Sequence, residues 1–331
     1  MPPVTISDIV DAHATLAPHV VLTALSPSAV LSEGTGSTIA VKAEHSQHTG
    51  SFKFRGALNR LAALSDDERR RGVVTASSGN HGVGVARAAG IVGVAATVVV
   101  PTGASPSKLA AIRSHPGVHV VTVRERDAIA AERHARVLAG QTGATYVSPY
   151  NDPMVIAGQA TIAVEVTDQV PAIGWEDLSA IVVAVGGGGL IGGIGTWVRA
   201  HHPDTVVVAA QPAADAVMAA SIVAGHVVDV DVDPTLSDGT AGNLEHDTIT
   251  FELCQRVVDE WVLVSEHDIA RTVALMIDGH HSLVEGAAAV ALHAARAWGT
   301  DHPGARVVAV SCGANISSAR LADALALATS A

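Results

Sequence analysis

"AIVVAVGGGGLIGGIGTWV", residues 180–198, decides the fold of this chain. Its apolar, β-branched start predicts a buried strand, the glycines that follow predict a tight loop, and the last part predicts a helix. The segment carries no charge over residues 180–198, which is roughly the length of a bilayer-spanning helix. Seven of these residues are glycines, and each would weaken an isolated helix by ~1 kcal/mol. We therefore expect a strand, loop and helix of an α/β protein.

The glycine loop is expected to bind an anion, because backbone N–H groups at the start of a helix can close on a phosphate. Gly187, Gly189 and Gly192 match the G-x-G-x-x-G pattern of dinucleotide-binding loops. Such a site also needs an acidic residue at the end of the next strand, where "TVVVAAQP" has Gln211. No Gly-Lys-Ser/Thr follows the glycines either. A cradle for a single phosphate is the prediction, with a purely structural glycine turn as the alternative.

Short β-branched runs alternate with longer amphipathic stretches along the chain, which is typical of parallel sheets with crossover helices. Strands are predicted at residues 38–44, 73–77, 94–100, 118–123, 144–149, 180–185, 205–210, 261–265 and 306–311. Helices are predicted near residues 82–90, 106–114, 127–141 and 154–169. The predicted fold class is α/β, and the break near residue 150 is a candidate domain boundary.

The composition limits the kinds of partner. The chain has 331 residues, 48% of them hydrophobic, and a formal charge of −12. This negative charge argues against nucleic acid or an anionic membrane as a partner, so a small molecule is expected. The two cysteines cannot form a disulfide framework. The start "MPPVTISDIV" lacks the basic and apolar regions of a signal peptide, and a cytoplasmic protein is expected.

"HTGSFKFRGA", residues 48–57, places Lys53 in the first turn of a predicted helix, with Ser51 as its candidate N-cap. The positive end of the helix dipole and any burial both favour the neutral amine. A neutral amine is a nucleophile, so Lys53 is a candidate for Schiff-base chemistry with a carbonyl compound. The alternative is a solvated surface lysine.

"VVTASSGNHGVGVARAA", residues 73–89, predicts a second strand, turn and helix, with polar residues at the turn. The small hydroxyl side chains of Ser77 and Ser78 and the free N–H groups around Gly79 and His81 suit a substrate carboxylate. The Asn80 amide suits a phenolate oxygen. The alternative is an ordinary helix N-cap.

A phosphate cradle, a nucleophilic lysine and an anion-binding Ser/Asn loop together meet the needs of pyridoxal 5′-phosphate (PLP). The chain resembles the fold type II PLP-dependent enzymes, which are tryptophan synthase β-like, and among them the threonine/serine dehydratase and serine racemase family. The resemblance runs nearly end to end, in family order, through "KAEHSQHTGSFKFRGA", "SSGNHGVGVA", "PSKLAAIR", "DPMVIAGQATIAVEV", "VGGGGLIGGI", "TLSDG", "LVEGAAAVAL" and "SCGAN".

The resemblance implies two doubly wound open-sheet domains with the cofactor between them. Residues 1–71 and 150–331 would form a large PLP-binding domain, and residues 72–149 a small mobile domain. A homodimer is implied in the same way, since relatives are mostly dimers.

The resemblance also implies a set of cofactor contacts. Lys53 would bind the aldehyde of PLP, Phe52 would pack against the ring, and Asn80 would bind the 3-hydroxyl. The phosphate would lie on Gly186, Gly187, Gly188, Gly189 and Leu190. Aligning "CGAN" with the family's "SGGN" motif selects Cys312 as the partner of the pyridine nitrogen, with Ser311 as the less favoured choice. A neutral partner would make the ring a weaker electron sink, which favours prompt loss of a β-leaving group.

The implied reaction is β-elimination of water. Ser77, Ser78, Gly79 and His81 would receive the substrate carboxylate, joined from the other side by Ser51 of "HTGS". Lys53 would take the α-proton and the β-hydroxyl would leave, so that a 2-oxo acid and ammonia result. The resemblance thus implies an ammonia-lyase (dehydratase) acting on a small β-hydroxy amino acid such as threonine or serine. Ser78 stands where racemases have an opposite-face acid/base, which leaves a serine racemase as an alternative.

Further alternatives concern the substrate, the activity and a metal. "LSDGTAGNLEHDTITF" and "HHSLVEGAAAVAL" resemble the hydroxyectoine-utilisation dehydratases, so a hydroxylated diamino acid is another candidate substrate. A catalytically silent cofactor-binding protein is the alternative from another class. Many relatives bind a divalent cation through a Glu and a nearby Asp, where this chain has Gln211 and Val217, with Asp215 close by. No metal is expected.

Overall fold

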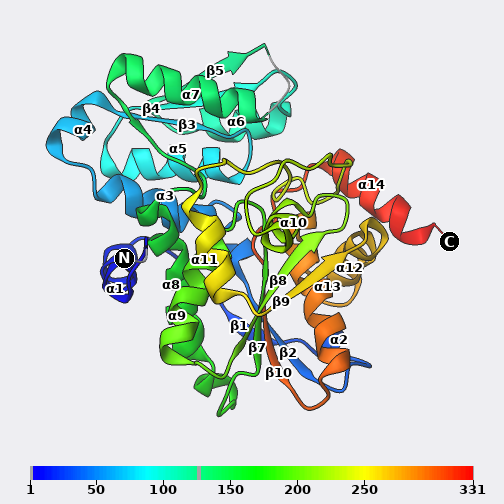
Figure 1. Ribbon diagram of the computed structural model, residues 1–331. Coiled ribbons are helices and arrows are strands. Elements are labelled where there is room, and N and C mark those ends of the chain that lie inside the picture. Colours follow the sequence, from blue (N-terminus) through cyan, green and yellow to red (C-terminus); the bar gives the residue numbers. More distant parts are fainter. Residues whose placement is uncertain (1–2, 125–127, 331) are drawn as a thin grey trace.

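The strands of this chain form two separate sheets in a computed structural model that describes residues 3–124 and 128–330 (Figure 1). Within these ranges the larger sheet has six strands in the order β1-β2-β10-β7-β8-β9, and only β1 and β2 pair antiparallel. The smaller sheet, at the top of Figure 1, has four parallel strands in the order β5-β4-β3-β6. Crossover helices connect the parallel strands, as the alternating pattern predicts.

The strands of the larger sheet are β1 (Leu25–Pro27), β2 (Thr38–Lys42), β7 (Ala180–Ala184), β8 (Val206–Pro212), β9 (Glu260–Val264) and β10 (Arg306–Val310). Those of the smaller sheet are β3 (Val73–Ala76), β4 (Ala96–Pro101), β5 (Val118–Val123) and β6 (Thr145–Tyr146).

The helices near the larger sheet are α1 (Ile6–Leu16), α2 (Ala29–Ser32), η1 (Glu44–Ser46), α3 (Lys53–Ala62), α8 (Pro153–Gln169), η2 (Pro171–Ile173), α9 (Gly189–His201), α10 (Val217–Ala224), α11 (Ile249–Val257), α12 (Glu266–Asp278), α13 (Gly286–Asp301) and α14 (Ser318–Thr329). Those near the smaller sheet are α4 (Asp66–Arg71), α5 (Asn80–Val92), α6 (Pro106–Arg113) and α7 (Ala128–Thr142).

Helices cover both faces of each sheet. In the smaller sheet, Val74 and Val99 face the alanines of α7, whereas Val73 and Val98 pack on the side of α5. This alternation follows from the two-residue period of a strand. In the larger sheet α13 packs on β10, β7 and β8, while α8 and α9 lie on the other side (Figure 1). Both faces of the central strand β7 are therefore buried, which explains why it is apolar throughout.

The predicted α/β class and its doubly wound architecture are confirmed. Every predicted strand is present, although the one at 144–149 pairs over only Thr145–Tyr146. The strand predicted at 38–44 is β2, between β1 and β10. The helix predicted near 127–141 is α7, and residue 127 lies outside the described residues. The strands of the two sheets fall inside the two predicted domain ranges, but the domain division and its mobility stay predictions.

One local prediction is wrong. Ser51 does not cap the helix that follows, because α3 begins at Lys53 after Phe52 and has no side-chain cap. Ser51 instead pairs through its backbone with Gly313, in the segment that follows β10. This non-local pairing places Ser51 one residue too early to act as the cap.

Among the helices of residues 3–124 and 128–330, none combines the length and the hydropathy that a membrane span requires.

Candidate active site

A cavity of about 480 Å³ lies where the carboxyl ends of strands from both sheets meet. Its wall includes the ends of β3 and β4, the loop after β7 and the segment after β10. Open α/β sheets bind ligands in this position. The cavity wall contains these residues from the sequence prediction: Phe52, Lys53, Ser77, Ser78, Gly79, Asn80, His81, Gly186, Gly187, Gly188, Gly189, Leu190 and Cys312.

Lys53 is the first residue of α3 and reaches into this cavity. Its Nζ donates a hydrogen bond to the Pro149 carbonyl at 2.8 Å and lies 5.2 Å from the centre of the Phe52 ring. Burial lowers the pKa of Lys53 to about 8, although Cys312, Glu132 and Glu285 act in the opposite direction. A substantial share of the amine is therefore neutral near pH 8, and Lys53 belongs to the cavity rather than to the outer surface.

The loop between β7 and α9 is suited to a small anion. Gly188 has φ +80°, a conformation that disfavours side chains, and a Cβ on Gly187 would lie 2.3 Å from the Tyr150 ring. The first N–H groups of α9 have no partner within the helix and are available to an anion. Gln211 accepts a hydrogen bond from the Ala219 N–H at 2.8 Å, so it is bound to α10 and replaces the ribose-binding acid of a dinucleotide site.

Asn80 opens α5 and is fixed by a triangle of polar groups. Its Nδ2 donates to Glu285 Oε1 at 2.8 Å, and its Oδ1 accepts from Asn315 Nδ2 at 2.7 Å. The Asn315 backbone N–H donates to Glu285 Oε2 at 3.1 Å. Burial, with the Asp238 charge as the second cause, raises the pKa of Glu285 to about 7. The second hydrogen on Asn80 Nδ2 remains available to an acceptor in the cavity.

His81 is a neutral residue in this site. It is buried, and its Nε2 donates to the Val147 carbonyl at 3.2 Å. Burial and the nearby Lys53 lower the pKa of His81 to about 3. Its imidazole therefore provides no positive charge for a carboxylate, and any contact with an anion would have to use its backbone N–H.

The two candidate partners of the pyridine nitrogen, Ser311 and Cys312, have different surroundings on the segment after β10. Cys312 lines the cavity, and burial raises the pKa of its thiol well above the usual value, so the thiol stays neutral. Ser311 does not line the cavity, and its Oγ lies 2.8 Å from His45 Nδ1. The preference for Cys312 thus fits the geometry. Ser51 is fully buried outside the cavity wall, and its Oγ has no partner among the described residues.

Glu285, Asn315 and Tyr150 also line the cavity, and the sequence reasoning did not single them out. The first two lie in "LVEGAAAVAL" and "SCGAN", so the motifs themselves were the available signal. The Tyr150 ring packs against the glycine loop, and its hydroxyl accepts from the Glu245 N–H at 3.0 Å. It closes the cavity beside the proposed phosphate cradle.

The residues at the position of the relatives' cation site have protein partners or apolar side chains. Asp215 Oδ2 accepts a hydrogen bond from the Gly242 N–H at 2.8 Å, and Val217 begins α10. Among residues 3–124 and 128–330, no three His, Cys, Asp or Glu side chains are grouped to hold a metal ion. The expectation of no metal stays a prediction.

These features match a known protein family. Residues 16–313 match the family model described as pyridoxal-phosphate dependent enzyme, and the chain belongs to this family. It is 42% identical to the L-threonine ammonia-lyase of Thermotoga maritima, over 95% of this chain and 76% of that protein. It is 35% identical to the catabolic L-threonine dehydratase of Escherichia coli, over 97% of this chain and 96% of that protein.

Solved structures show the same architecture. The processed threonine deaminase isoform 2 of Solanum lycopersicum superposes with a TM-score of 0.90 at 33% identity, covering 98% of this chain and 93% of that chain. Maize serine racemase superposes with a TM-score of 0.89 at 29% identity, covering 98% and 97%. The chain thus has the fold type II architecture of PLP-dependent enzymes.

Proposed function

We propose that this protein is an ammonia-lyase that eliminates water from a small β-hydroxy amino acid, giving a 2-oxo acid and ammonia. The observation that carries the proposal is Lys53, an amine with a pKa of about 8 in a cavity that also holds the glycine loop, Asn80 and Cys312. The proposal is supported by the threonine ammonia-lyases and dehydratases to which the chain is 35–42% identical.

The residues present fit PLP. The glycine loop would hold the phosphate on the backbone N–H groups at the start of α9, and the Tyr150 ring leaves no room for a side chain at Gly187, so the backbone there stays bare. Asn80 would donate to the phenolate oxygen, because its Oδ1 is already occupied by Asn315. Cys312 would face the pyridine nitrogen as a neutral thiol, Phe52 would pack on the ring, and Lys53 would bind the aldehyde covalently.

PLP supplies, when bound, an electron sink for the negative charge that develops at the substrate α-carbon. The chain's own groups then orient the substrate and move its proton. Lys53 Nζ would take the α-proton after the substrate amine has replaced it at the aldehyde, since its lowered pKa leaves a basic amine available near neutral pH. Ser77, Ser78 and the N–H groups of Gly79 and His81, at the start of α5, receive the substrate carboxylate, which takes the place of Ser77 Oγ as the acceptor for the Gly79 N–H. Ser51 joins them only if the segment 48–51 shifts, because it lies outside the cavity wall.

The test begins with the purified protein and PLP. We expect a coloured protein whose borohydride reduction leaves a pyridoxyl group on the peptide that contains Lys53. A panel of β-hydroxy amino acids should then yield equimolar 2-oxo acid and ammonia from at least one member. Colourless protein without the adduct would contradict the cofactor assignment, and absence of 2-oxo acid from every member would contradict the reaction.

A serine racemase is the second candidate, because Ser78 lines the cavity and serine racemases share the fold at 29–30% identity. Ser78 Oγ would then exchange a proton on the face opposite Lys53. Product chirality from one enantiomer of serine separates the two activities. A hydroxylated diamino acid stays an untested alternative substrate, since the diaminopropionate ammonia lyase structures at 18–19% identity support the fold alone.

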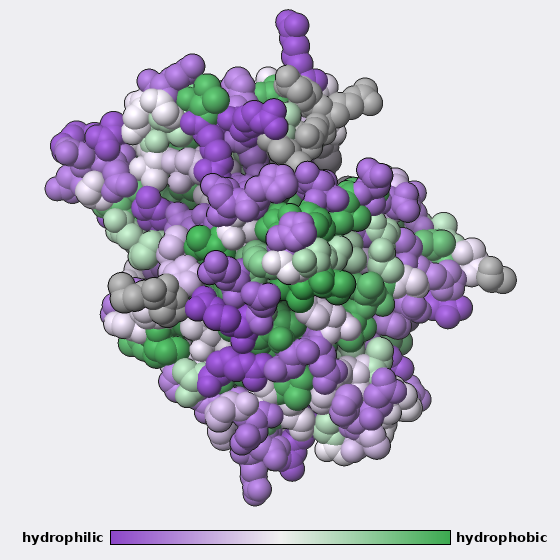
Figure 2. All heavy atoms as spheres, in the orientation of Figure 1, coloured by the Kyte–Doolittle hydropathy of each residue, from purple (hydrophilic) through white to green (hydrophobic). Residues whose placement is uncertain are grey.

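We also propose a homodimer in the cytoplasm. Figure 2 shows hydrophobic residues gathered around α10, and Val223 on α10 and Leu263 on the edge strand β9 are 90% and 52% exposed. Apolar surface of this kind is typical of an interface between subunits. Light scattering of the purified protein should give twice the chain mass, and a variant with Val223→Glu and Leu263→Glu should shift this toward the monomer.

A further inference from the structure

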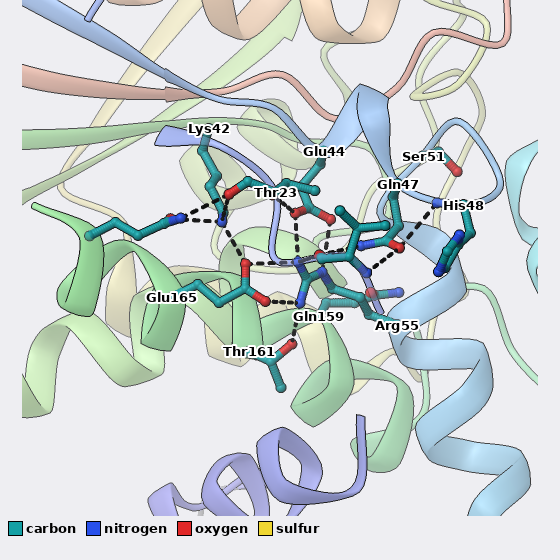
Figure 3. A network of polar contacts seen from close by, with 12 residues as sticks. Thr23, Lys42, Glu44, Gln47, His48, Ser51, Arg55, Gln159, Thr161 and Glu165 are labelled. Carbon is teal, nitrogen blue, oxygen red and sulfur yellow. Dashed lines mark hydrogen bonds and ion pairs between the residues drawn. The ribbon is translucent and has the colours of Figure 1, made fainter. Parts of the chain in front are cut away.

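Four charged side chains lie buried together beside α3: Lys42, Glu44, Arg55 and Glu165 (Figure 3). The Arg55 guanidinium donates to both carboxylate oxygens of Glu44 at 2.8 Å each. It donates to both oxygens of Glu165 at 2.6 and 2.9 Å. Lys42 Nζ donates to Glu165 at 2.5 Å. Two cations thus balance two anions, and Arg55 is the centre of the cluster.

The Glu44–Arg55 pair joins the two ends of one chain segment. Glu44 begins η1, Arg55 lies in the first turn of α3, and the ten residues 45–54 between them include Phe52 and Lys53. Gln47 strengthens the base of this segment, since its Oε1 accepts from the N–H groups of Val21 and His48 at 3.0 and 3.1 Å. The segment is therefore closed at its base by two hydrogen bonds between buried charges.

The other side of the segment is bound to the chain that follows β10. The Phe52 N–H donates to the Cys312 carbonyl at 3.1 Å, and the Ala314 N–H donates to the Gly50 carbonyl at 2.9 Å. The segment 45–54 thus lies between the charge cluster and the residues that face the cavity. A shift at Arg55 would move the first turn of α3 relative to Cys312.

Stability alone does not explain this arrangement. Replacing a buried ion pair by apolar residues of similar volume is often neutral or stabilising, since desolvation offsets the attraction between the charges. Reacting groups, by contrast, tolerate little displacement, and an error of ~1 Å can cost about 10² in rate. A guanidinium that binds two carboxylates bidentately fixes the positions of these groups more narrowly than apolar packing does.

We propose that Arg55 is a positioning residue, and that its fork to Glu44 clamps the segment 45–54 so that the Lys53 amine is held in the cavity. This inference rests on the proposed function only in taking Lys53 as the reacting amine. The fork matters and not the charge alone, because a lysine at this position is a point charge that cannot bind two carboxylates bidentately.

The test compares Arg55→Lys with Lys42→Met as the matched control. The control removes a charge from the same cluster but leaves the Arg55 contacts to Glu44 and Glu165 in place. The chain has three lysines, Lys42, Lys53 and Lys108, so an acylating amine reagent and peptide mass mapping report Lys53 directly in the wild type and in Lys42→Met. In Arg55→Lys, fragmentation of the peptide separates a label on Lys53 from a label on the new amine at position 55. In the cofactor-free wild type, labelling of Lys53 should rise with pH around a midpoint near 8.

We expect Arg55→Lys to move this midpoint upward, toward the ordinary lysine value, because a released segment lets water reach the amine. Its kcat should fall by about 10- to 100-fold while KM changes much less. Lys42→Met should keep the wild-type midpoint and kcat. The far-ultraviolet spectrum and the unfolding midpoint of each variant establish that it is folded.

A folded Arg55→Lys protein with the wild-type midpoint and kcat would overturn the clamp, and so would an equal shift in Lys42→Met. If Arg55→Lys does not fold, Glu44→Gln answers the same question, because it keeps the size and removes one strong acceptor. The labelling experiment needs no PLP. A protein that binds no PLP but shows the Arg55-dependent midpoint would therefore refute the proposed function and leave the clamp standing.

Discussion

Glu44 and Glu285 are both buried, but their carboxylates are satisfied in two different ways. Glu44, in the charge cluster, accepts from Arg55 at 2.8 Å. Burial by itself raises the pKa of Glu44, but the charge and hydrogen bonds of Arg55 outweigh it and hold the pKa below its usual value. Glu285, in the cavity, accepts from the neutral amides of Asn80 and Asn315. Burial and the nearby Asp238 charge raise its pKa by more than these hydrogen bonds and the Lys108 charge lower it, so the pKa rises to about 7.

This difference between Glu44 and Glu285 distinguishes groups with a fixed charge from groups that can gain or lose a proton. In the cluster each carboxylate has a buried cation, and Arg55 and Glu44 stay ionised at every physiological pH. In the cavity Lys53 and Glu285 have pKa values of about 8 and 7, close to the pH at which an enzyme works. Perturbed groups gather at functional sites for this reason. Four predictions test this division, from the largest expected effect to the smallest.

Removing the cavity amine should have the largest effect. Lys53→Ala deletes both the proposed covalent link to PLP and the proposed base, and we expect a loss of at least about 10³ in kcat, since base catalysis alone contributes about 10²–10⁴. Folding should be unaffected, because within the described part of the chain the Lys53 side chain donates a single hydrogen bond, to the Pro149 carbonyl. The measurement is 2-oxo acid release by the variant loaded with excess PLP. Retention of more than a tenth of the wild-type rate would remove Lys53 from the mechanism.

Removing the cluster's central cation should lower stability in addition to releasing the segment 45–54. Arg55→Met leaves Glu44 and Glu165 buried, with Lys42 as the remaining partner of Glu165. Breaking a buried pair in this way costs about 3–5 kcal/mol. Urea unfolding of the cofactor-free protein measures this loss. A double variant Arg55→Met/Glu44→Gln should recover part of the lost free energy of unfolding. An Arg55→Met protein as stable as the wild type would show that water reaches the charges of the cluster.

The buried carboxyl of Glu285 should make the free energy of unfolding depend on pH. Because the folded pKa of Glu285 is about 7 and the unfolded one about 4.5, the folded state binds the extra proton between these values. Its contribution to stability is present below pH 4.5 and is lost as pH rises through 7, by about 3 kcal/mol in all. Glu285→Gln should abolish this slope, which urea unfolding from pH 4.5 to 8 measures against the wild type. Parallel curves for the two proteins would place the pKa of Glu285 near its ordinary value.

The sequence predicted those features of the fold and the site that depend on residues close together along the chain. The β-branched runs and the glycine loop are found within a few residues of their predicted positions, because strand periodicity and turn chemistry depend on neighbours along the chain. The polar partnerships are not local. Asn80 and Glu285 are 205 residues apart, and Arg55 and Glu165 are 110 apart, so no window of sequence shows that they meet. Ser51 failed as a cap for the same reason, because Gly313 pairs with it across the fold.

The smallest effects should come from an ion pair at the edge of the cavity. Lys108 and Asp238 pair at 2.7 Å with side chains 26% and 41% exposed, so removing either should cost less than about 1 kcal/mol. The two act oppositely on Glu285, because Asp238 raises its pKa and Lys108 lowers it. Asp238→Asn should therefore move the upper end of the Glu285-dependent loss of stability to lower pH, and Lys108→Met should move it to higher pH, which urea unfolding from pH 4.5 to 8 measures. Shifts in the same direction would mean that the pKa of Glu285 does not depend on the charges of Asp238 and Lys108. The pKa values of Glu285 and Glu44 would then differ because of burial and not because of neighbouring charges at the cavity edge.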